Sequence, residues 1–220
     1  ARELEFEQAD DTRMHYVGSM VCADRHYEKS TASDVFQAWV KRRKSSGNPL
    51  VYCSYSTFWN TGSGNIQPLL DLFVRRQDLD IVIGLGGKTQ TMPVDDLPDN
   101  ILVMDFAPQL EVLDKAAVAI THGGISTINE ALHKGVPLIV CSAGHVDQNG
   151  CMARLVHHRV GLAASSDPIN AAELERLIDD LTGESGVETR TRVAEIQACL
   201  KRYDKNQSAV TLLRRILDDQ

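Results

Sequence analysis

The chain has 220 residues, of which 43% are hydrophobic and 24% charged, an ordinary composition for a globular protein with a sizeable core. Its formal net charge of −7 argues against a general binder of nucleic acid or of anionic membrane surfaces. No apolar run approaches the roughly 20 residues that a membrane helix needs, and no signal peptide opens the chain, so we expect no membrane span and a cytoplasmic location.

The first 31 residues show no sustained periodicity, so we expect a linker or extended lead-in at 1–31 and one domain at 32–220. Within that domain, short apolar runs alternate with segments of helical periodicity. We expect strands at 50–54, 80–84, 101–104, 118–121, 137–141 and 160–163. We expect helices at 32–45, 66–73, 108–115, 125–134, 148–158, 170–181, 188–203 and 207–218. This alternation predicts an α/β fold, a Rossmann-like parallel sheet with helices on both faces.

Ligands of such sheets bind beyond the carboxyl ends of the strands. That rule points to the four loops that follow Ser54, Gly84, Thr121 and Cys141. The five cysteines include no CxxC pair, and two of them lie in predicted strands, so we expect buried free thiols rather than disulfides or a zinc site.

The segment 121–130 combines a strand end, two glycines and a helix start. The glycines allow a sharp turn, and the helix start offers unpaired N–H groups and a positive dipole end, which suit a phosphate. His122 and Thr127 add hydrogen-bond donors, and Glu130 can accept both hydroxyls of a ribose. A plain strand–turn–helix, with Glu130 in solvent, is the alternative that short glycine motifs always leave open.

Three further loops carry polar or glycine-rich segments. The loop 84–89 matches neither the phosphate-binding P-loop nor the dinucleotide fingerprint, so we expect only a mobile connection that borders a ligand. Hydroxyls at 54–57 suit phosphate contacts, although a polar loop explains them equally well. Asp147 and Gln148 can bind neighbouring sugar hydroxyls, unless Asp147 is simply a helix N-cap.

Taken in order, these segments resemble the carboxyl-terminal signature of the UDP-glycosyltransferase family, which has the two-domain GT-B fold. The matching residues are Phe106–Gln109, Val112, Leu113, His122–Gly124, Thr127, Glu130, Gly135–Pro137, Asp147 and Gln148, followed by Gly150, Ala153, Arg154, Val160 and Gly161 of the bacterial variety. Phe106 stands where many relatives have tryptophan, and Ser56 where glycine is usual. The resemblance extends over nearly the whole chain.

The resemblance implies a donor site for a nucleotide-sugar. Phe106 would stack on the base, the backbone of Ala107 would pair with the base edge, and Gln109 and Glu130 would hold the ribose.

For the rest of the donor, the resemblance assigns the pyrophosphate to His122, Gly124 and Thr127, with help from Thr57. The acid–amide pair Asp147 and Gln148 would bind the sugar hydroxyls.

In function, the resemblance implies a glycosyltransferase that transfers a hexosyl group from a UDP- or dTDP-sugar to an acceptor hydroxyl. No cofactor or metal is implied. The family's catalytic base lies in an amino-terminal acceptor-binding domain, so we expect a domain fragment without catalytic residues, inactive alone, whose partners are the donor and that domain. The start at Ala1 fits a fragment. Two alternatives stay open: a non-catalytic nucleotide-sugar-binding subunit with a separate partner chain, and a sugar-nucleotide epimerase of similar fold.

Overall fold

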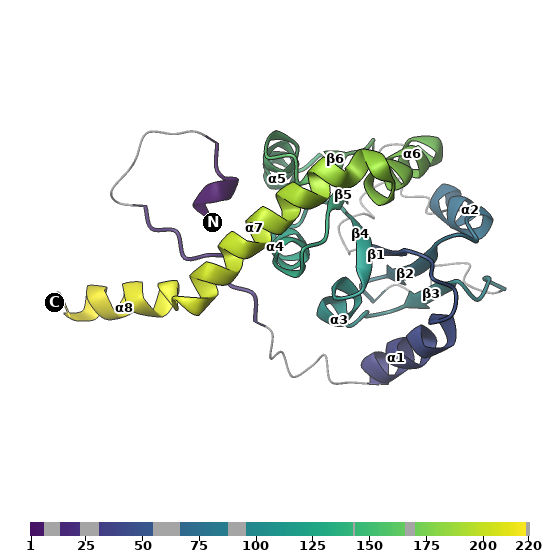
Figure 1. Cartoon of the computed structure of the whole chain (residues 1–220), viewed down its shortest axis with the longest axis horizontal. Coiled ribbons are helices and arrows are strands. Elements are labelled where there is room, and N and C mark those ends of the chain that lie inside the picture. The colour runs from purple at the N-terminus through teal and green to yellow at the C-terminus, as the bar shows by residue number, and fades with distance from the viewer. Residues whose placement is uncertain are drawn as a thin grey trace.

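The computed structural model describes residues 1–6, 14–22, 31–54, 67–87, 96–142, 144–165 and 170–218. Its centre is a six-stranded sheet in the order β3-β2-β1-β4-β5-β6, with every pair of neighbours parallel (Figure 1). The strands are β1 (Leu50–Ser54), β2 (Asp80–Gly84), β3 (Ile101–Met104), β4 (Ala116–Thr121), β5 (Leu138–Val140) and β6 (Gly161–Ala163). This strand order is that of a doubly wound Rossmann-like sheet, so the predicted fold class is confirmed.

Helices cover both faces of the sheet. The elements are η1 (Arg2–Leu4), α1 (Thr31–Arg43), α2 (Gln67–Arg75), α3 (Gln109–Leu113), α4 (Ile125–Lys134), α5 (Val146–His157), α6 (Ala171–Thr182), η5 (Glu184–Gly186), α7 (Val187–Lys205) and α8 (Ser208–Asp218). One core contains α2 and α6, and the other contains α1, α3, α4, α5 and α7. The predicted elements are all present, and their ends differ from the predicted ones by at most two residues.

Side chains of β1 alternate between the two cores. Val51 and Cys53 point to the core with α2 and α6, whereas Leu50 and Tyr52 point to the core with α3 and α4. All five residues of β1 are buried, which is why this strand has an apolar run instead of a polar–apolar alternation. Burial also raises the pKa of the free thiols Cys53 and Cys141, the latter to about 12, so these two cysteines are unreactive core residues as expected.

The chain reverses its direction of winding between β1 and β4. From β1 the sheet grows to β2 and β3 on one side, and from β4 to β5 and β6 on the other. Ser54 pairs with Gly84 and with Thr121, and Thr121 pairs with Val140, so the four predicted loops start level with one another. A switch point of this kind leaves a crevice beyond the carboxyl ends of β1 and β4, where ligands of such folds bind.

Helix α4 is attached to α7 at its carboxyl end. Gly135, with a φ of +79°, ends α4 in the left-handed conformation. The amide of Gln197, on α7, donates to the His133 carbonyl at 3.0 Å and lies 2.9 Å from where a Cβ on Gly135 would be. A side chain at position 135 would displace this amide, so glycine lets α7 close over the end of α4.

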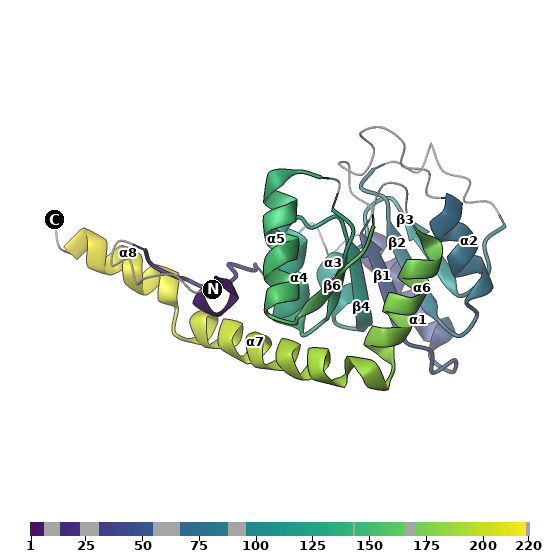
Figure 2. The same ribbon diagram turned by 90° about the horizontal axis from the view of Figure 1, so that it is seen from above.

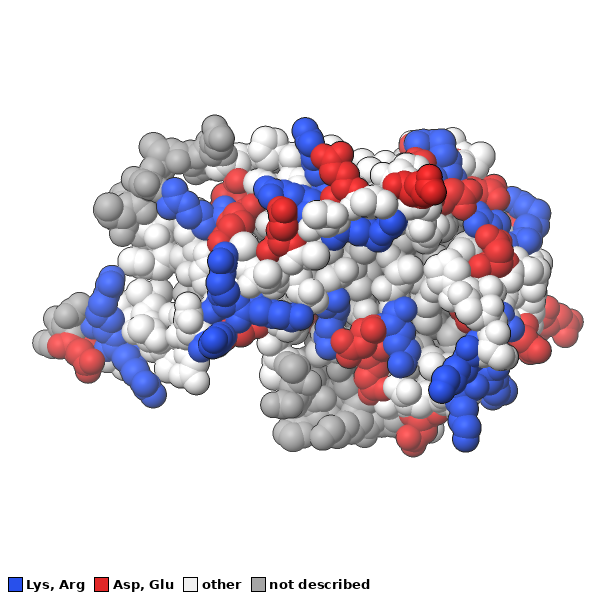
Figure 3. All heavy atoms as spheres, viewed as in Figure 1, with Lys and Arg blue, Asp and Glu red and all other residues white. Residues whose placement is uncertain are grey.

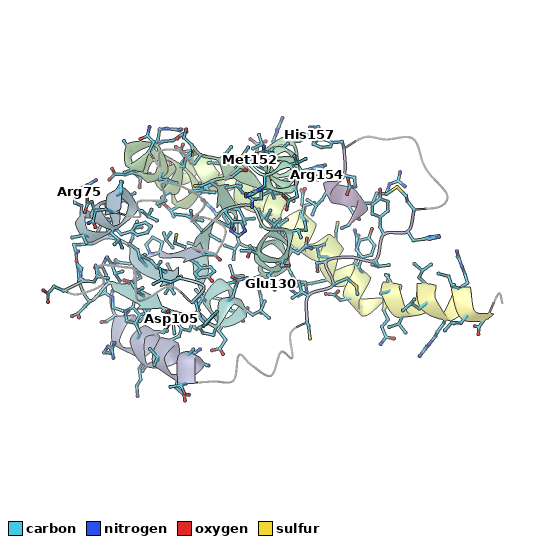
Figure 4. The ribbon with its side chains drawn as sticks, turned by 180° about the vertical axis from the view of Figure 1, so that it is seen from behind. Arg75, Asp105, Glu130, Met152, Arg154 and His157 are labelled. Atoms are coloured by element: carbon cyan, nitrogen blue, oxygen red, sulfur yellow. The ribbon has the colours of Figure 1, made fainter. Side chains whose placement is uncertain are left out.

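The N-terminal segment lies near α7, whereas α8 leads the chain away from the sheet. Helix α8 continues past the sheet, and the N-terminal segment runs near the α5 and α7 helices (Figures 1 and 2). Glu5 pairs with Arg154 of α5 at 3.1 Å, and the Phe6 ring contacts His157 edge-on, which places both α5 side chains toward the N-terminal segment (Figure 4). None of the described helices is both long and apolar enough to cross a membrane.

Candidate functional site

The turn between β4 and α4 is built around Gly123. This residue has a φ of +98°, and a Cβ placed on it would lie 3.1 Å from Cγ1 of Val140 and 3.3 Å from the backbone oxygen of Gln148. Both the backbone angle and the close neighbours therefore favour glycine here. The absence of a side chain brings the start of α4 against the first turn of α5.

His122 covers the start of α4. It is only 7% exposed, and its Nε2 lies 2.8 Å from where a Cβ on Gly124 would be, so glycine makes room for the ring. The N-cap residue of α4 is Gly124, which has no side chain to cap the helix. The N–H groups of that turn and the positive end of the helix dipole thus lie next to an imidazole donor.

The charge state of His122 follows from its surroundings. Burial lowers the pKa of His122 below the ordinary 6.5, Asp147 opposes that effect by raising it, and His145 lowers it further. His122 is therefore neutral near pH 7, and one ring nitrogen carries a proton that can be donated to a phosphate oxygen.

Gln109 and Glu130 meet where α3 and α4 lie side by side. Nε2 of Gln109 donates to Oε2 of Glu130 at 2.6 Å and lies 3.5 Å from the Thr127 hydroxyl oxygen. On its other side, Oε1 of Gln109 accepts from the Tyr52 hydroxyl at 3.0 Å. Glu130 is only 6% exposed on α4, so it is not the solvated side chain of the plain strand–turn–helix alternative (Figure 4).

Phe106 is an exposed aromatic residue at the same edge of the sheet. It is 69% exposed and lies two residues after Met104, where β3 ends. Gly87 N donates to Asp105 O at 3.1 Å, and a Cβ on Gly87 would lie 3.1 Å from Cζ of Phe106. The described part of the glycine-rich loop 84–89 thus lies against the Phe106 ring. The neighbouring Ala107 is half-buried.

The start of α5 carries the remaining candidates. Asp147 is exposed in the first helical turn, and the N-cap position belongs to His145, so the structure does not make Asp147 the cap. Gln148, in contrast, is 4% exposed and packs against Gly123. The loop before α5 is braced by a hydrogen bond of 2.6 Å from the Ser142 hydroxyl to Oδ1 of Asn149.

The structure brings some of the candidates into contact, in two groups. Direct side-chain contacts connect Gln109, Thr127 and Glu130, and close packing connects His122 with Gly124. Thr57 lies outside the described residues. In the described part of the chain, no group of His, Cys, Asp or Glu side chains is placed to hold a metal ion.

Sequence reasoning missed Tyr52. In the sequence, Tyr52 looks like any other core residue of a buried strand. The alternation of side chains along β1 is the one signal that could have placed its hydroxyl on the side of α3. The contact of Gly87 with Phe106 was missed as well, because it depends on the pairing of β2 with β3.

The six-stranded parallel sheet, with polar side chains collected at its switch point, defines a Rossmann-like domain. The family model described as erythromycin biosynthesis protein CIII-like, C-terminal domain, matches residues 68–199. The chain belongs to this family of glycosyltransferase C-terminal domains.

Two relatives match almost the whole chain. Zeaxanthin glucosyltransferase of Pantoea ananas is 31% identical over 218 residues, which cover 98% of this chain and 47% of that protein. NDP-glycosyltransferase YjiC of Bacillus licheniformis is 28% identical over 211 residues, with coverages of 94% and 49%. The chain therefore spans about half the length of these two relatives, and both of them are glycosyltransferases by name.

Solved structures agree in fold. The glycotransferase of kitacinnamycin superposes with a TM-score of 0.68 at 23% identity and covers 77% of this chain and 44% of its own. Glycosyltransferase VinC, solved in complex with DTDP, has a TM-score of 0.66 at 22% identity, with coverages of 79% and 43%. This architecture is thus one half of a GT-B glycosyltransferase, as the sequence predicted.

Proposed function

We propose that this chain binds the nucleotide-sugar donor of a glycosyltransferase, a UDP- or dTDP-sugar from which a hexosyl group is transferred to an acceptor hydroxyl. The observation that carries the proposal is the 2.6 Å contact of Gln109 with Glu130, close to the start of α4, whose N-cap is Gly124, at the switch point. The buried carboxylate can accept hydrogen bonds from hydroxyls, and the N–H groups at the nearby helix start can donate to an anion. The name NDP-glycosyltransferase supports a nucleoside-diphosphate sugar as the donor, and the name glucosyltransferase supports transfer of a hexosyl group.

In the proposed complex, the nucleotide lies along the carboxyl edge from β3 to β4. The exposed ring of Phe106 stacks on the base, and the backbone of Ala107 pairs with the base edge. Gln109 and Glu130 take the ribose hydroxyls, which compete with the hydrogen bond that now joins the two side chains.

The pyrophosphate is proposed to lie at the start of α4. His122, Gly124 and Thr127 provide its donors in this chain, and Thr57 is proposed to add one from the loop after β1. The sugar then extends toward Asp147 and Gln148 at the start of α5.

Local fields must supply the attraction for this anionic ligand, because the whole chain carries a net charge of −7. On the face shown in Figure 3, acidic and basic side chains are interspersed over the surface. The dipole and free N–H groups of α4 provide a concentrated positive potential, which acts on the leaving diphosphate in transfer.

In this proposal, an amino-terminal acceptor-binding domain deprotonates the acceptor hydroxyl. The residues assigned here bind and orient the donor and stabilise the charge of the leaving group, and they need neither a metal ion nor a cofactor for that role. We therefore expect donor binding by this chain without transfer.

Isothermal titration of the 220-residue chain with UDP and dTDP tests the proposal. We expect binding with a Kd in the micromolar to millimolar range, roughly −4 to −8 kcal/mol, and much weaker binding of uridine, which lacks the phosphates. If a folded chain gives neither heat nor chemical-shift changes at millimolar nucleotide, the proposal is wrong.

A further inference from the structure

We infer that Tyr52 is a positioning residue for the nucleotide: it fixes the Gln109 amide so that the amide nitrogen faces Glu130 and the ribose. This inference rests on the proposed function, because it concerns how the ribose site is built. Tyr52 itself is 2% exposed and belongs to the core that contains α3 and α4, so it acts through Gln109 rather than on the ligand.

The hydrogen bonds determine which way the amide points. Glu130 is a carboxylate and can only accept, so the side of the Gln109 amide that faces it at 2.6 Å must be the NH2 group. The carbonyl oxygen then faces Tyr52, whose hydroxyl must donate across the 3.0 Å contact. The Ser54 hydroxyl, 3.5 Å from the same oxygen, is at the outer limit of a hydrogen bond.

The two ends of the Gln109 amide are held by different partners. Its nitrogen contacts Glu130 at 2.6 Å and Thr127 at 3.5 Å. Its oxygen has the Tyr52 hydroxyl at 3.0 Å and only the 3.5 Å contact with Ser54 besides. Without the Tyr52 hydroxyl, the oxygen loses its shorter hydrogen bond, so the amide is less restrained in the orientation in which Gln109 and Glu130 form a joint donor and acceptor pair.

The packing around the hydroxyl fits this role. A Cβ on Gly84 would lie only 3.2 Å from the Tyr52 hydroxyl oxygen, so the end of β2 leaves the space that this oxygen occupies. Because Tyr52 is on β1, Gln109 on α3 and Glu130 on α4, the hydrogen bonds connect three elements at the switch point.

The experiment compares Tyr52→Phe with wild type for binding of UDP and of 2′,3′-dideoxy-UDP. We expect a loss of about three- to tenfold for UDP, the usual value of a neutral hydrogen bond, and no change for the dideoxy nucleotide. In a Gln109→Ala background, Tyr52→Phe should cause no further loss. Tyr203→Phe is the matched control, since it removes a tyrosine hydroxyl that contacts Glu3 at 3.2 Å, and it should bind UDP as wild type does.

Each other outcome has a definite meaning. Equal losses for both nucleotides, or a further loss in the Gln109→Ala background, would make Tyr52 a packing residue and overturn the inference. Wild-type chain that binds UDP and the dideoxy nucleotide equally would also overturn it, while nucleotide binding itself would stand. Wild-type chain that binds neither would refute the proposed function and this inference together.

A measurement on the wild-type chain covers the case in which Tyr52→Phe does not fold. The side-chain amide protons of Gln109 should exchange slowly with water before any ligand is added, and UDP should shift their resonances. Exchange as fast as that of an exposed glutamine would show that the amide is not fixed and would overturn the inference.

Discussion

The first turns of α4 and α5 start at the same edge of the sheet, but their side chains are held differently. On α4, Thr127 and Glu130 are buried and contact Gln109. On α5, Asp147 is exposed and Val146 is 89% exposed. Only Gln148 of that turn is buried, and it packs against the glycine turn that precedes α4.

The difference separates an ordered part of the site from an open one. The part assigned to the ribose has its side chains already buried and in contact, so little side-chain entropy is lost there when the ligand binds. Of the two residues assigned to the sugar, Asp147 faces solvent in this chain. We expect affinity to come mainly from the nucleotide, and discrimination between sugars to depend on surfaces that complete the α5 side.

The largest effect is expected from a substitution at Gly123, where the start of α4 packs against the first turn of α5. In Gly123→Ala, the new Cβ meets Val140 and the backbone of Gln148 at a φ of +98°, so the free energy of unfolding should fall by about 1–3 kcal/mol. UDP affinity should fall too, since the start of α4 must move away from α5. Thermal and urea unfolding measure the first effect, and titration the second.

Gly150→Ala is the control for that change. Gly150 lies inside α5, and the nearest neighbour of its new Cβ would be Arg154 Nη1 at 3.5 Å, an ordinary contact. Alanine favours a helix interior, so this variant should gain roughly 0.5–1 kcal/mol. If Gly123→Ala were as stable as Gly150→Ala, the close junction of α4 and α5 would be refuted.

Two substitutions, one in each part of the site, should have smaller effects on ligand affinity and should distinguish the two parts. His122→Ala should weaken UDP and UDP-sugar alike, by about tenfold or more, because it removes a donor to a charged phosphate. Asp147→Ala should weaken only the UDP-sugar and leave UDP unchanged, since Asp147 is assigned to the sugar. Titration of both ligands into both variants measures this, and an equal loss of UDP affinity for Asp147→Ala would erase the distinction between the two parts.

The smallest effect concerns pH. Burial lowers the pKa of His122 below 6.5 in the free chain, and a bound diphosphate should raise it again by favouring the charged form. UDP should therefore bind more tightly as the pH falls through the interval between the two values, until the phosphate itself is protonated. Without ligand the sign is opposite: the unfolded chain binds the proton more readily, so stability falls as the pH drops below about 6.5.

An NMR titration of the His122 ring protons, with and without UDP, measures both pKa values. In His122→Ala the pH dependence of UDP binding over this interval should disappear, apart from the contribution of the phosphate. An unchanged midpoint on addition of UDP would mean that the phosphates lie away from His122.

The sheet and its loops could be predicted because each depends on local patterns. Apolar runs marked the strands, helical periodicity marked the helices, and the rule for carboxyl ends then placed the loops after Ser54 and Thr121 side by side, as their pairing in the sheet shows. Contacts between elements could not be predicted in this way. Tyr52 has the same pattern as any core residue of a strand, and its hydroxyl gains a role only when α3 is packed over β1.

The individual roles of the site residues remain predictions. Sequence similarity placed Gln109 and Glu130 at one ribose, and the structure brings them into contact, but a contact does not identify the ligand. For Asp147 and Gln148, adjacency in sequence suggested one shared task, whereas their helix turns one side chain outward and the other into the core. Helical geometry, which separates neighbours by about 100°, explains why such a pair divides.

The glycine that ends α4 has a consequence for the way the domain opens. Because α7 closes over Gly135 and the Gln197 amide donates to the His133 carbonyl near the end of α4, we expect the two helices to open together in local unfolding. A ligand bound at the first turn of α4, as proposed above, should then slow hydrogen exchange in α7, although it does not contact that helix.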